Sequence, residues 1–222
     1  MSSAEILKEV AAEVSTCARC DLCKSRTRAV PGEGNPQAKI LFIGEGPGFH
    51  EDKQGRPFVG PSGQLLQELL KSINLKREDV FITNVVKCRP PDNRDPLPAE
   101  IDACNDYLDR QIAAIQPLVI VTLGRHSMAK FFSGEKISAI HGRARIVGGQ
   151  GEPKKDGYIC IPMFHPAAAL RTESYKIALR EDFKKIPVAL AEAERLAAEV
   201  SAKPAVPASV KKEEPPQQMS LF

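Results

Sequence analysis

The sequence lacks any run of apolar residues long enough to cross a membrane, so it does not encode a helical membrane protein. It also lacks a large excess of charge: the formal net charge of +3 excludes a strongly basic protein but permits a basic patch on one face. Its first residues, MSSAEILKEVAAEV, include acidic side chains and no long apolar stretch, unlike a secretory signal peptide. We therefore expect a cytoplasmic protein with no membrane partner.

The composition is otherwise that of a globular protein. Hydrophobic residues make up 42% and charged residues 27% of the 222 residues, which suits one domain with a sizeable core, followed by a tail. The chain has six cysteines, although structural disulfides are rare in a reducing compartment. Closely spaced cysteines there indicate metal ligation or redox chemistry in place of cross-links.

Short apolar runs that predict buried strands alternate with segments of helical periodicity. We expect strands at 39–43, 80–83, 118–122 and 158–162, and helices at 3–15, 62–73, 100–115 and from about 126. This alternation predicts a single-domain, three-layer α/β/α fold with a mainly parallel central sheet of about four strands. Ligands of such sheets bind outside the carboxyl ends of the strands. The unusual motifs all lie there, which predicts a single site: Gly44-Glu45-Gly46, Asn84, Gly124-Arg125 and His165.

The last fifth of the chain changes character. Residues 174–200 favour a helix that Pro187 interrupts. Residues 201–217 are rich in Pro, Lys, Glu, Ala and Ser and have no apolar periodicity, which predicts a disordered linker. Residues 218–222 are abruptly apolar again. We therefore expect a folded domain over residues 1–200, a linker over 201–217 and a terminal peptide over 218–222.

Four cysteines have spacings that suit a shared metal site. Cys17 and Cys20 form a C-x2-C pair. Cys88 is expected in the loop at the end of a strand, and Cys104 inside a helix. Four thiolates fit either Zn²⁺ or a [4Fe–4S] cluster, and spacing alone does not choose between them. Free buried cysteines and a redox pair are weaker alternatives. Cys160 lies in an apolar strand and is most simply a small buried side chain.

Single motifs say little here. The Gly-rich loop at 44–48 matches neither a Walker loop nor a dinucleotide fingerprint, and His165-Pro166 alone is weak evidence. The order of the motifs is more specific: Cys17-x-x-Cys20, Gly32-Glu33-Gly34-Asn35-Pro36, Gly44 to Gly48 with Glu51-Asp52, Gly55 to Gly60, Thr83-Asn84 to Pro91, Asn93-Arg94-Asp95-Pro96, Cys104 and His165-Pro166-Ala167. Over residues 14–185 this set closely resembles the family 4 uracil-DNA glycosylases, which carry an iron–sulfur cluster.

The resemblance implies a function and a cofactor. It implies a monofunctional hydrolase that cleaves the N-glycosidic bond of deoxyuridine in DNA, leaving an abasic site for base excision repair. It implies a [4Fe–4S] cluster on Cys17, Cys20, Cys88 and Cys104, with Cys23 outside the pattern. The chain lacks the Arg-Arg-Ile-His insertion of a related group that binds uracil covalently, which disfavours that outcome.

The resemblance also assigns roles in a uracil pocket. Gly44 and Gly46 belong to the first pocket loop, in which Glu45 is the leading candidate for positioning the attacking water, with Glu51 and Asp52 as alternatives. A flipped uracil would stack on Phe58, Asn84 would read its edge, and His165 would face its O2.

Contacts with DNA outside the pocket follow from the same resemblance. Leu170 is the nearest wedge for the duplex, and Arg171 would insert or contact phosphate. Independently of the resemblance, Arg89 and Arg94 flank the cluster region, and together with Lys87 and Arg56 they would form a phosphate-contacting patch. A solvated charged surface is the alternative. We expect a monomer, associated with the nucleoid, that acts on uracil in single- or double-stranded DNA.

The terminal peptide has a resemblance of its own. Gln218-Met219-Ser220-Leu221-Phe222 resembles the bacterial sliding-clamp binding peptide Gln-x-Ser/Asp-Leu-Phe. Leu221 and Phe222 would be the apolar anchors, and Gln218 would hydrogen-bond at the rim of the pocket. A fortuitous apolar end is the alternative.

Two other functions for the whole chain stay open. One is a non-catalytic iron–sulfur protein that binds DNA damage, and the other is an electron carrier. The presence of Glu45, Phe58, Asn84 and His165 favours the enzyme, since neither alternative needs all four.

Overall fold

The computed structural model describes residues 1–148 and 157–202 of the chain. The helices of this part are α1 (Ser3–Thr16), α2 (Leu22–Ser25), α3 (Phe49–Gln54), α4 (Pro61–Ser72), α5 (Pro98–Ile115), α6 (Arg125–Ala129), α7 (Ile137–Ile140), α8 (Pro166–Ala169), α9 (Glu173–Phe183) and α10 (Ile186–Ala202). The strands are β1 (Glu33–Gly34), β2 (Ile40–Gly44), β3 (Phe81–Asn84), β4 (Val119–Leu123), β5 (Arg145–Val147) and β6 (Tyr158–Met163), and two 3-10 turns are η1 (Arg77–Asp79) and η2 (Pro91–Asn93).

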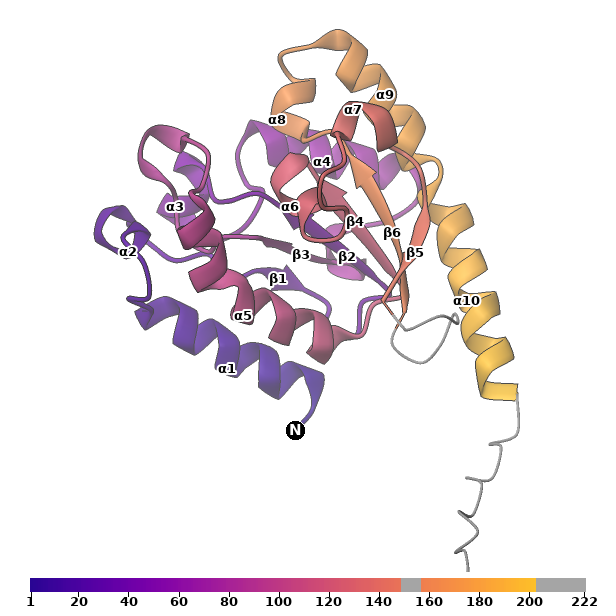
Figure 1. Ribbon diagram of the computed structural model, residues 1–222, viewed down its shortest axis with the longest axis horizontal. Coiled ribbons are helices and arrows are strands. Elements are labelled where there is room, and N and C mark those ends of the chain that lie inside the picture. Colours follow the sequence, from indigo (N-terminus) through magenta and orange to yellow (C-terminus); the bar gives the residue numbers. More distant parts are fainter. Residues whose placement is uncertain (149–156, 203–222) are drawn as a thin grey trace, which may run out of the picture.

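The strands form one mixed sheet in the order β1-β3-β2-β4-β6-β5 (Figure 1). The four central strands run parallel, which confirms the four predicted strands and their direction. The two outer strands are additional and antiparallel. The sequence did not reveal them because β1 has two residues and β5 has three mostly exposed ones, too few for a periodic pattern.

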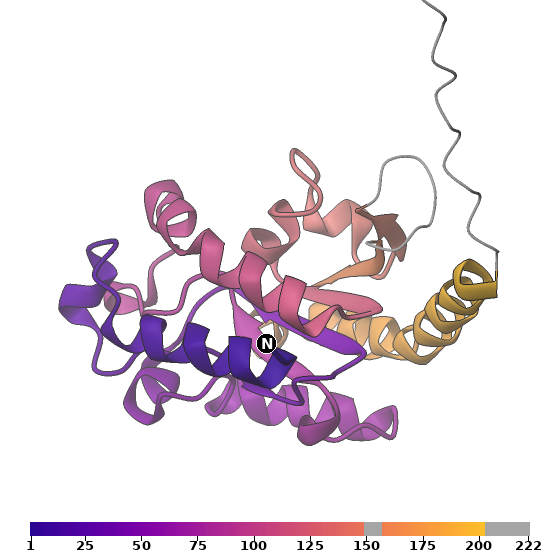
Figure 2. The ribbon, with the colours of Figure 1, turned by 90° about the horizontal axis from the view of Figure 1, so that it is seen from below.

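Helices cover both faces of the sheet, which confirms the three-layer prediction (Figures 1 and 2). Side chains alternate along each strand, so Leu41 and Ile43 face the core beneath α1 and α5, whereas Ile40 and Phe42 face α4, α9 and α10. On the second face Phe42 stacks on Phe183 with ring centroids 5.9 Å apart. Each fully buried apolar side chain of this kind contributes about 1.5–3 kcal/mol to folding.

The C-terminal helices follow the predicted interruption. α9 ends at Phe183 and α10 begins at Ile186, so Pro187 lies in the first turn of α10, where a missing N–H costs little. α10 continues to Ala202, two residues into the segment expected as a linker. The remainder of that linker and the peptide over 218–222 lie outside the described residues. No helix of the described part is long and apolar enough to cross a membrane.

Candidate active site and cysteine pocket

The first pocket loop and the base-reading candidate meet where β2 and β3 end. Gly44 and Asn84 are paired in the parallel register of these strands. A Cβ at Gly44 would collide with Asn84 Oδ1 and would lie 2.7 Å from Phe58 Cζ. Only glycine therefore lets the amide and the phenyl ring approach this loop so closely.

Asn84 presents an unpaired polar atom inside the protein. Its side chain is 1% exposed, and Oδ1 has no hydrogen-bond partner within the described part of the chain. Leaving a buried carbonyl oxygen unpaired costs about 1–3 kcal/mol, and a ligand that donates a hydrogen bond to this atom would offset that cost. The adjacent backbone is fixed, because Val85 N–H donates to Gly44 O at 3.0 Å and Val86 N–H donates to Glu45 O at 3.1 Å.

Phe58 is held in a strained backbone conformation beside this amide. Its φ is +51°, which is rare for a bulky residue, and its side chain is 6% exposed. The Arg77 guanidinium donates to Phe58 O at 2.9 Å and also to Pro57 O, which holds the turn in place. Glycine is required at position 63, where a Cβ would collide with Phe58 O. The phenyl ring faces the imidazole of His165, with centroids 5.7 Å apart and planes at 28°.

His165 is fixed as a neutral hydrogen-bond donor. It is the N-cap of α8, and its Nδ1 accepts the backbone N–H of Ala167 at 3.0 Å. An accepting Nδ1 carries no proton, so the proton of the neutral ring lies on Nε2. Burial lowers the pKa of His165 to about 4, although the charge of Glu51 opposes this shift. The imidazole is therefore uncharged at neutral pH.

Glu45 lies at the edge of the same loop in a polar cluster. Burial raises its pKa, and the negative charge of Asp95 adds to this, while His126 and Arg125 oppose it. Its Oε2 is 3.8 Å from His126 Nε2, which is 3.5 Å from Asp95 Oδ1, and Arg125 pairs with Asp95. Sequence reasoning assigned no role to Asp95 or His126. The signals were the Asp95-Pro96 motif and the position of His126 directly after Gly124-Arg125.

The two alternative carboxylates, Glu51 and Asp52, hold loops together. Glu51 accepts backbone N–H groups from Gly48 at 3.2 Å and from Val59 and Gly60 at 2.9 Å each. Asp52 is 2% exposed and accepts the backbone N–H of Thr27 at 2.8 Å. Within the described residues the Glu45 carboxylate accepts no backbone N–H, and its near neighbours are His126 and Asp95.

If Glu45 takes part in catalysis, the pH dependence of activity should report its protonation. Burial raises its pKa above the ordinary value of a glutamate, whereas burial lowers the pKa of His165 to about 4, so Glu45 is protonated first as the pH falls. We expect kcat/KM to fall as the pH is lowered through the pKa of Glu45. Glu45→Gln should lower the rate and flatten this acid limb, measured as initial rates across a pH series. A limb that persists unchanged in Glu45→Gln would assign it to another group.

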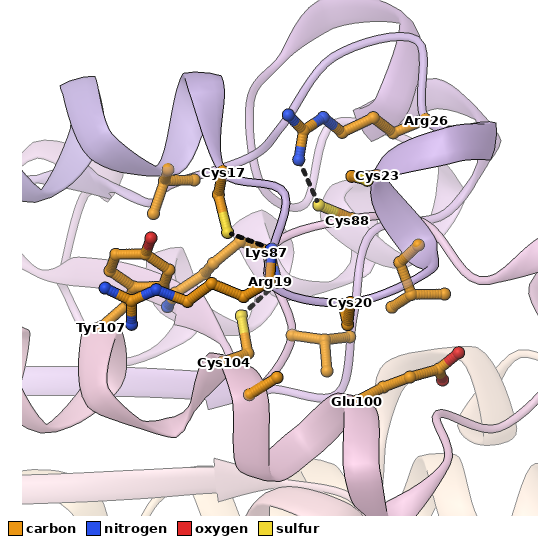
Figure 3. A pocket seen from close by; sticks show the side chains of 14 residues that line it. Cys17, Arg19, Cys20, Cys23, Arg26, Lys87, Cys88, Glu100, Cys104 and Tyr107 are labelled. Atoms are coloured by element: carbon orange, nitrogen blue, oxygen red, sulfur yellow. Dashed lines mark hydrogen bonds between the residues drawn. The ribbon is translucent and has the colours of Figure 1, made fainter.

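The four predicted ligand cysteines line one pocket between α1, the loop to α2, the loop after β3 and α5 (Figure 3). Several N–H groups donate to their sulfur atoms. Lys87 N–H lies 3.3 Å from Cys104 Sγ, the Arg26 guanidinium 3.1 Å from Cys88 Sγ, and Arg19 N–H 3.5 Å from Cys17 Sγ. Cys23 also lines the pocket, and Cys160 is fully buried elsewhere, as predicted. The donor set fits an anionic sulfur site.

One of the four predicted phosphate contacts, that of Lys87, is wrong. Lys87 is 1% exposed and its ammonium is used inside the protein, so it cannot contact DNA. The other three have protein partners at the surface: Arg56 binds Glu33, Arg94 binds Glu100, and Arg89 binds Asn93. Sequence alone could not place Lys87 in the protein interior, because a lysine is rarely buried.

The predicted wedge lies at the surface directly after α8. Leu170 is 48% exposed and Arg171 is exposed, whereas Ala169 is buried at 1%. Ala169 therefore faces the core, and Leu170 is the apolar side chain that this turn offers to a partner.

Several known proteins are similar to this chain over most of its length. Residues 31–189 match the Uracil DNA glycosylase superfamily. The type-4 uracil-DNA glycosylase of Sulfurisphaera tokodaii is 53% identical over 189 residues, covering 84% of each chain. Those of Archaeoglobus fulgidus and Thermotoga maritima are 47% and 45% identical, over 82% of this chain in both cases and 92% and 93% of theirs. The chain therefore belongs to the type-4 branch of the uracil-DNA glycosylase superfamily.

Proposed function

We propose that this protein is a monofunctional uracil-DNA glycosylase, which hydrolyses the bond between uracil and deoxyribose in DNA. The observation that carries the proposal is the unpaired Asn84 Oδ1, buried beside Phe58 and His165. The type-4 relatives are named for this activity. A base must leave the duplex to enter such a pocket, at a cost of a few kcal/mol.

Asn84 would distinguish uracil from cytosine. Its Oδ1 would accept the N3–H of uracil and its amide would donate to O4, which is the complement of one edge of this base. Cytosine offers a bare N3 and an amino group, so both contacts would be mispaired in a dry pocket. Phe58 would stack on the face of the base, worth about 1–3 kcal/mol.

His165 and Glu45 would act on the two products of bond cleavage. Uracil leaves with negative charge on O2, and the Nε2–H of neutral His165 is available to donate to it. The sugar becomes cationic in character, and the carboxylate of Glu45 would stabilise it and orient the water that attacks it. Each well-placed donor of this kind is worth about 2.7–4 kcal/mol in the transition state.

The activity is tested on an oligonucleotide with one deoxyuridine. The protein should convert this strand to an abasic product that alkali cleaves, and strands with cytosine or thymine at that position should stay intact. Tight binding of the deoxyuridine strand without release of uracil would favour the non-catalytic alternative, and would refute the enzyme.

We also propose that the cysteine pocket holds a [4Fe–4S] cluster, ligated by Cys17, Cys20, Cys88 and Cys104. Four thiolates around one zinc ion, each at about 2.3 Å, would be about 3.8 Å apart. Within residues 1–148 and 157–202, no three cysteine sulfurs all lie within 4.8 Å of one another, a spacing wider than around one zinc ion, which supports a larger group. Such a cluster would act structurally here, joining the loop before α2 to the loop after β3 and to α5.

Replacing Cys88 with serine should remove the cluster. We expect the visible absorbance to vanish and the iron content to fall well below about four atoms per chain. Cys23→Ser is the matched control, since Cys23 lines the pocket outside the ligand set, and it should stay coloured. Wild-type protein that contains stoichiometric zinc and no iron would contradict this assignment.

We propose that DNA lies across the turn after α8, with Leu170 as the wedge and Arg171 in contact with phosphate. The side chains of Leu170 and Arg171 are both exposed. A further arginine, Arg89, lies near the exposed Phe49, with its guanidinium 5.3 Å from the ring centroid. We also propose that the protein acts as a monomer at the nucleoid. If these arginines contact phosphate, affinity for DNA falls steeply as salt rises.

We propose that Gln218, Leu221 and Phe222 bind a sliding clamp, as the sequence of the terminal peptide predicts. Deleting residues 218–222 should abolish capture by immobilised clamp and leave uracil excision unchanged. The full chain is the control in both assays. Undiminished capture of the shortened chain would place the clamp contact elsewhere.

A further inference from the structure

Lys87 is a buried cation with a complete set of partners. Its ammonium donates to Thr83 Oγ1 at 2.6 Å, to Asn84 O at 2.8 Å and to Gln111 Oε1 at 2.7 Å. These acceptors use all three of its N–H bonds. Burial of an unpaired ammonium would be costly, so this network fixes the geometry of its members.

All three acceptors of the ammonium are neutral, and the main chain of Lys87 reaches the cysteine pocket. The Lys87 backbone N–H donates to Cys104 Sγ at 3.3 Å, and the next residue is Cys88. One residue thus contacts a predicted ligand through its main chain and Asn84 through its side chain.

The segment from Asn84 to Cys88 is short, and the backbone N–H groups of residues 85–87 all donate hydrogen bonds. Its Val85 and Val86 N–H groups donate to the carbonyls of Gly44 and Glu45, so it also carries the first pocket loop. Lys87 closes this segment onto itself by binding Asn84 O. A displacement of Cys88 or Cys104 is therefore transmitted to the atoms that would hold uracil.

We propose that Lys87 is a positioning residue that couples occupancy of the cysteine pocket to uracil binding at Asn84. The proposal rests on the function proposed above for both sites. Coupling between two binding events is reciprocal. Uracil bound at Asn84 therefore favours retention of the cluster at equilibrium, and loss of the cluster weakens binding of uracil.

The test follows cluster loss by the fading of visible absorbance in excess iron chelator, with and without saturating free uracil. Four proteins are compared: wild type, Lys87→Met, Lys87→Arg and Lys130→Met. Lys130 is the matched control because its charge acts on Lys87 while its own partners are Asp109 and Asn105, and within the described residues it makes no hydrogen bond to residues 84–88. Uracil should slow the loss about fivefold or more in wild type and in Lys130→Met.

The Lys87 variants decide the proposal. Uracil should give no protection in Lys87→Met and partial protection in Lys87→Arg, which keeps the charge. If Lys87→Met does not fold with a cluster, Thr83→Val serves instead, since it removes one of the three acceptors and should reduce the protection.

The coupling would be overturned if uracil slowed cluster loss as much in Lys87→Met (or in Thr83→Val, where that variant replaces it) as in wild type. It would also be overturned if uracil did not slow cluster loss in wild type. A wild-type protein that excises uracil but shows no protection would refute only this inference. A protein without excision would refute the proposed function.

Discussion

Replacing His165 with alanine is expected to lower kcat for uracil excision about a hundredfold or more, with a smaller change in KM. The reason is the protonation state that the fold imposes. Nδ1 accepts the Ala167 N–H and burial lowers the pKa of His165 to about 4, so the ring is neutral and carries its proton on Nε2. This donor gains strength only as charge develops on the departing uracil, which is why the loss falls on kcat.

His50→Ala is the control for this variant, since His50 is exposed and its ring contacts the neighbouring Phe49. Initial rates under saturating single-stranded substrate measure the effect, and thermal unfolding checks that the variant is folded. A His165→Ala protein with a near-normal rate would remove this imidazole from the departure of the base.

Replacing Asn84 with leucine should lower kcat/KM for deoxyuridine about a hundredfold. The variant keeps the shape of the side chain but leaves uracil N3–H and O4 without partners in a buried site, at about 1–3 kcal/mol for each unpaired group. The variant protein itself should be no less stable than wild type, because the buried Asn84 Oδ1 has no hydrogen-bond partner among the described residues that the substitution would remove. Loss of activity and retention of stability would therefore separate recognition from folding.

Thr122→Val is the matched control for Asn84→Leu. Thr122 Oγ1 is the other buried side-chain atom without a partner in the part of the chain that the structure describes, and it lies on β4, which β2 separates from the strand of Asn84. This variant should excise uracil at close to the wild-type rate. Equal activity of Asn84→Leu and wild type would show that the amide does not read the base.

Much of the fold and the meeting of the pocket residues were predictable from sequence. Buried strands of a parallel sheet appear as apolar runs, and the rule that ligands bind at their carboxyl ends placed Gly44, Asn84 and His165 together. The structure confirms that they share one end of the sheet, with Phe58 added from a loop. The chemical roles of these residues remain predictions.

Features that depend on tertiary contacts were not predictable. Lys87 was placed on the surface from its charge, but the fold surrounds it with Thr83, Asn84 and Gln111. Asp95 and His126 are distant in sequence and meet only because the loop after η2 folds against α6. Such pairings follow from backbone paths, which a local pattern does not encode.

The central claim is that a neutral imidazole and an amide converge on uracil. The most direct measurement is the ¹⁵N NMR spectrum of histidine-labelled protein at neutral pH, titrated with free uracil and, separately, with cytosine. The account predicts that His165 has the proton on Nε2 throughout, and that its signal shifts with uracil but not with cytosine. An imidazolium, a proton on Nδ1, or no response to uracil would contradict it.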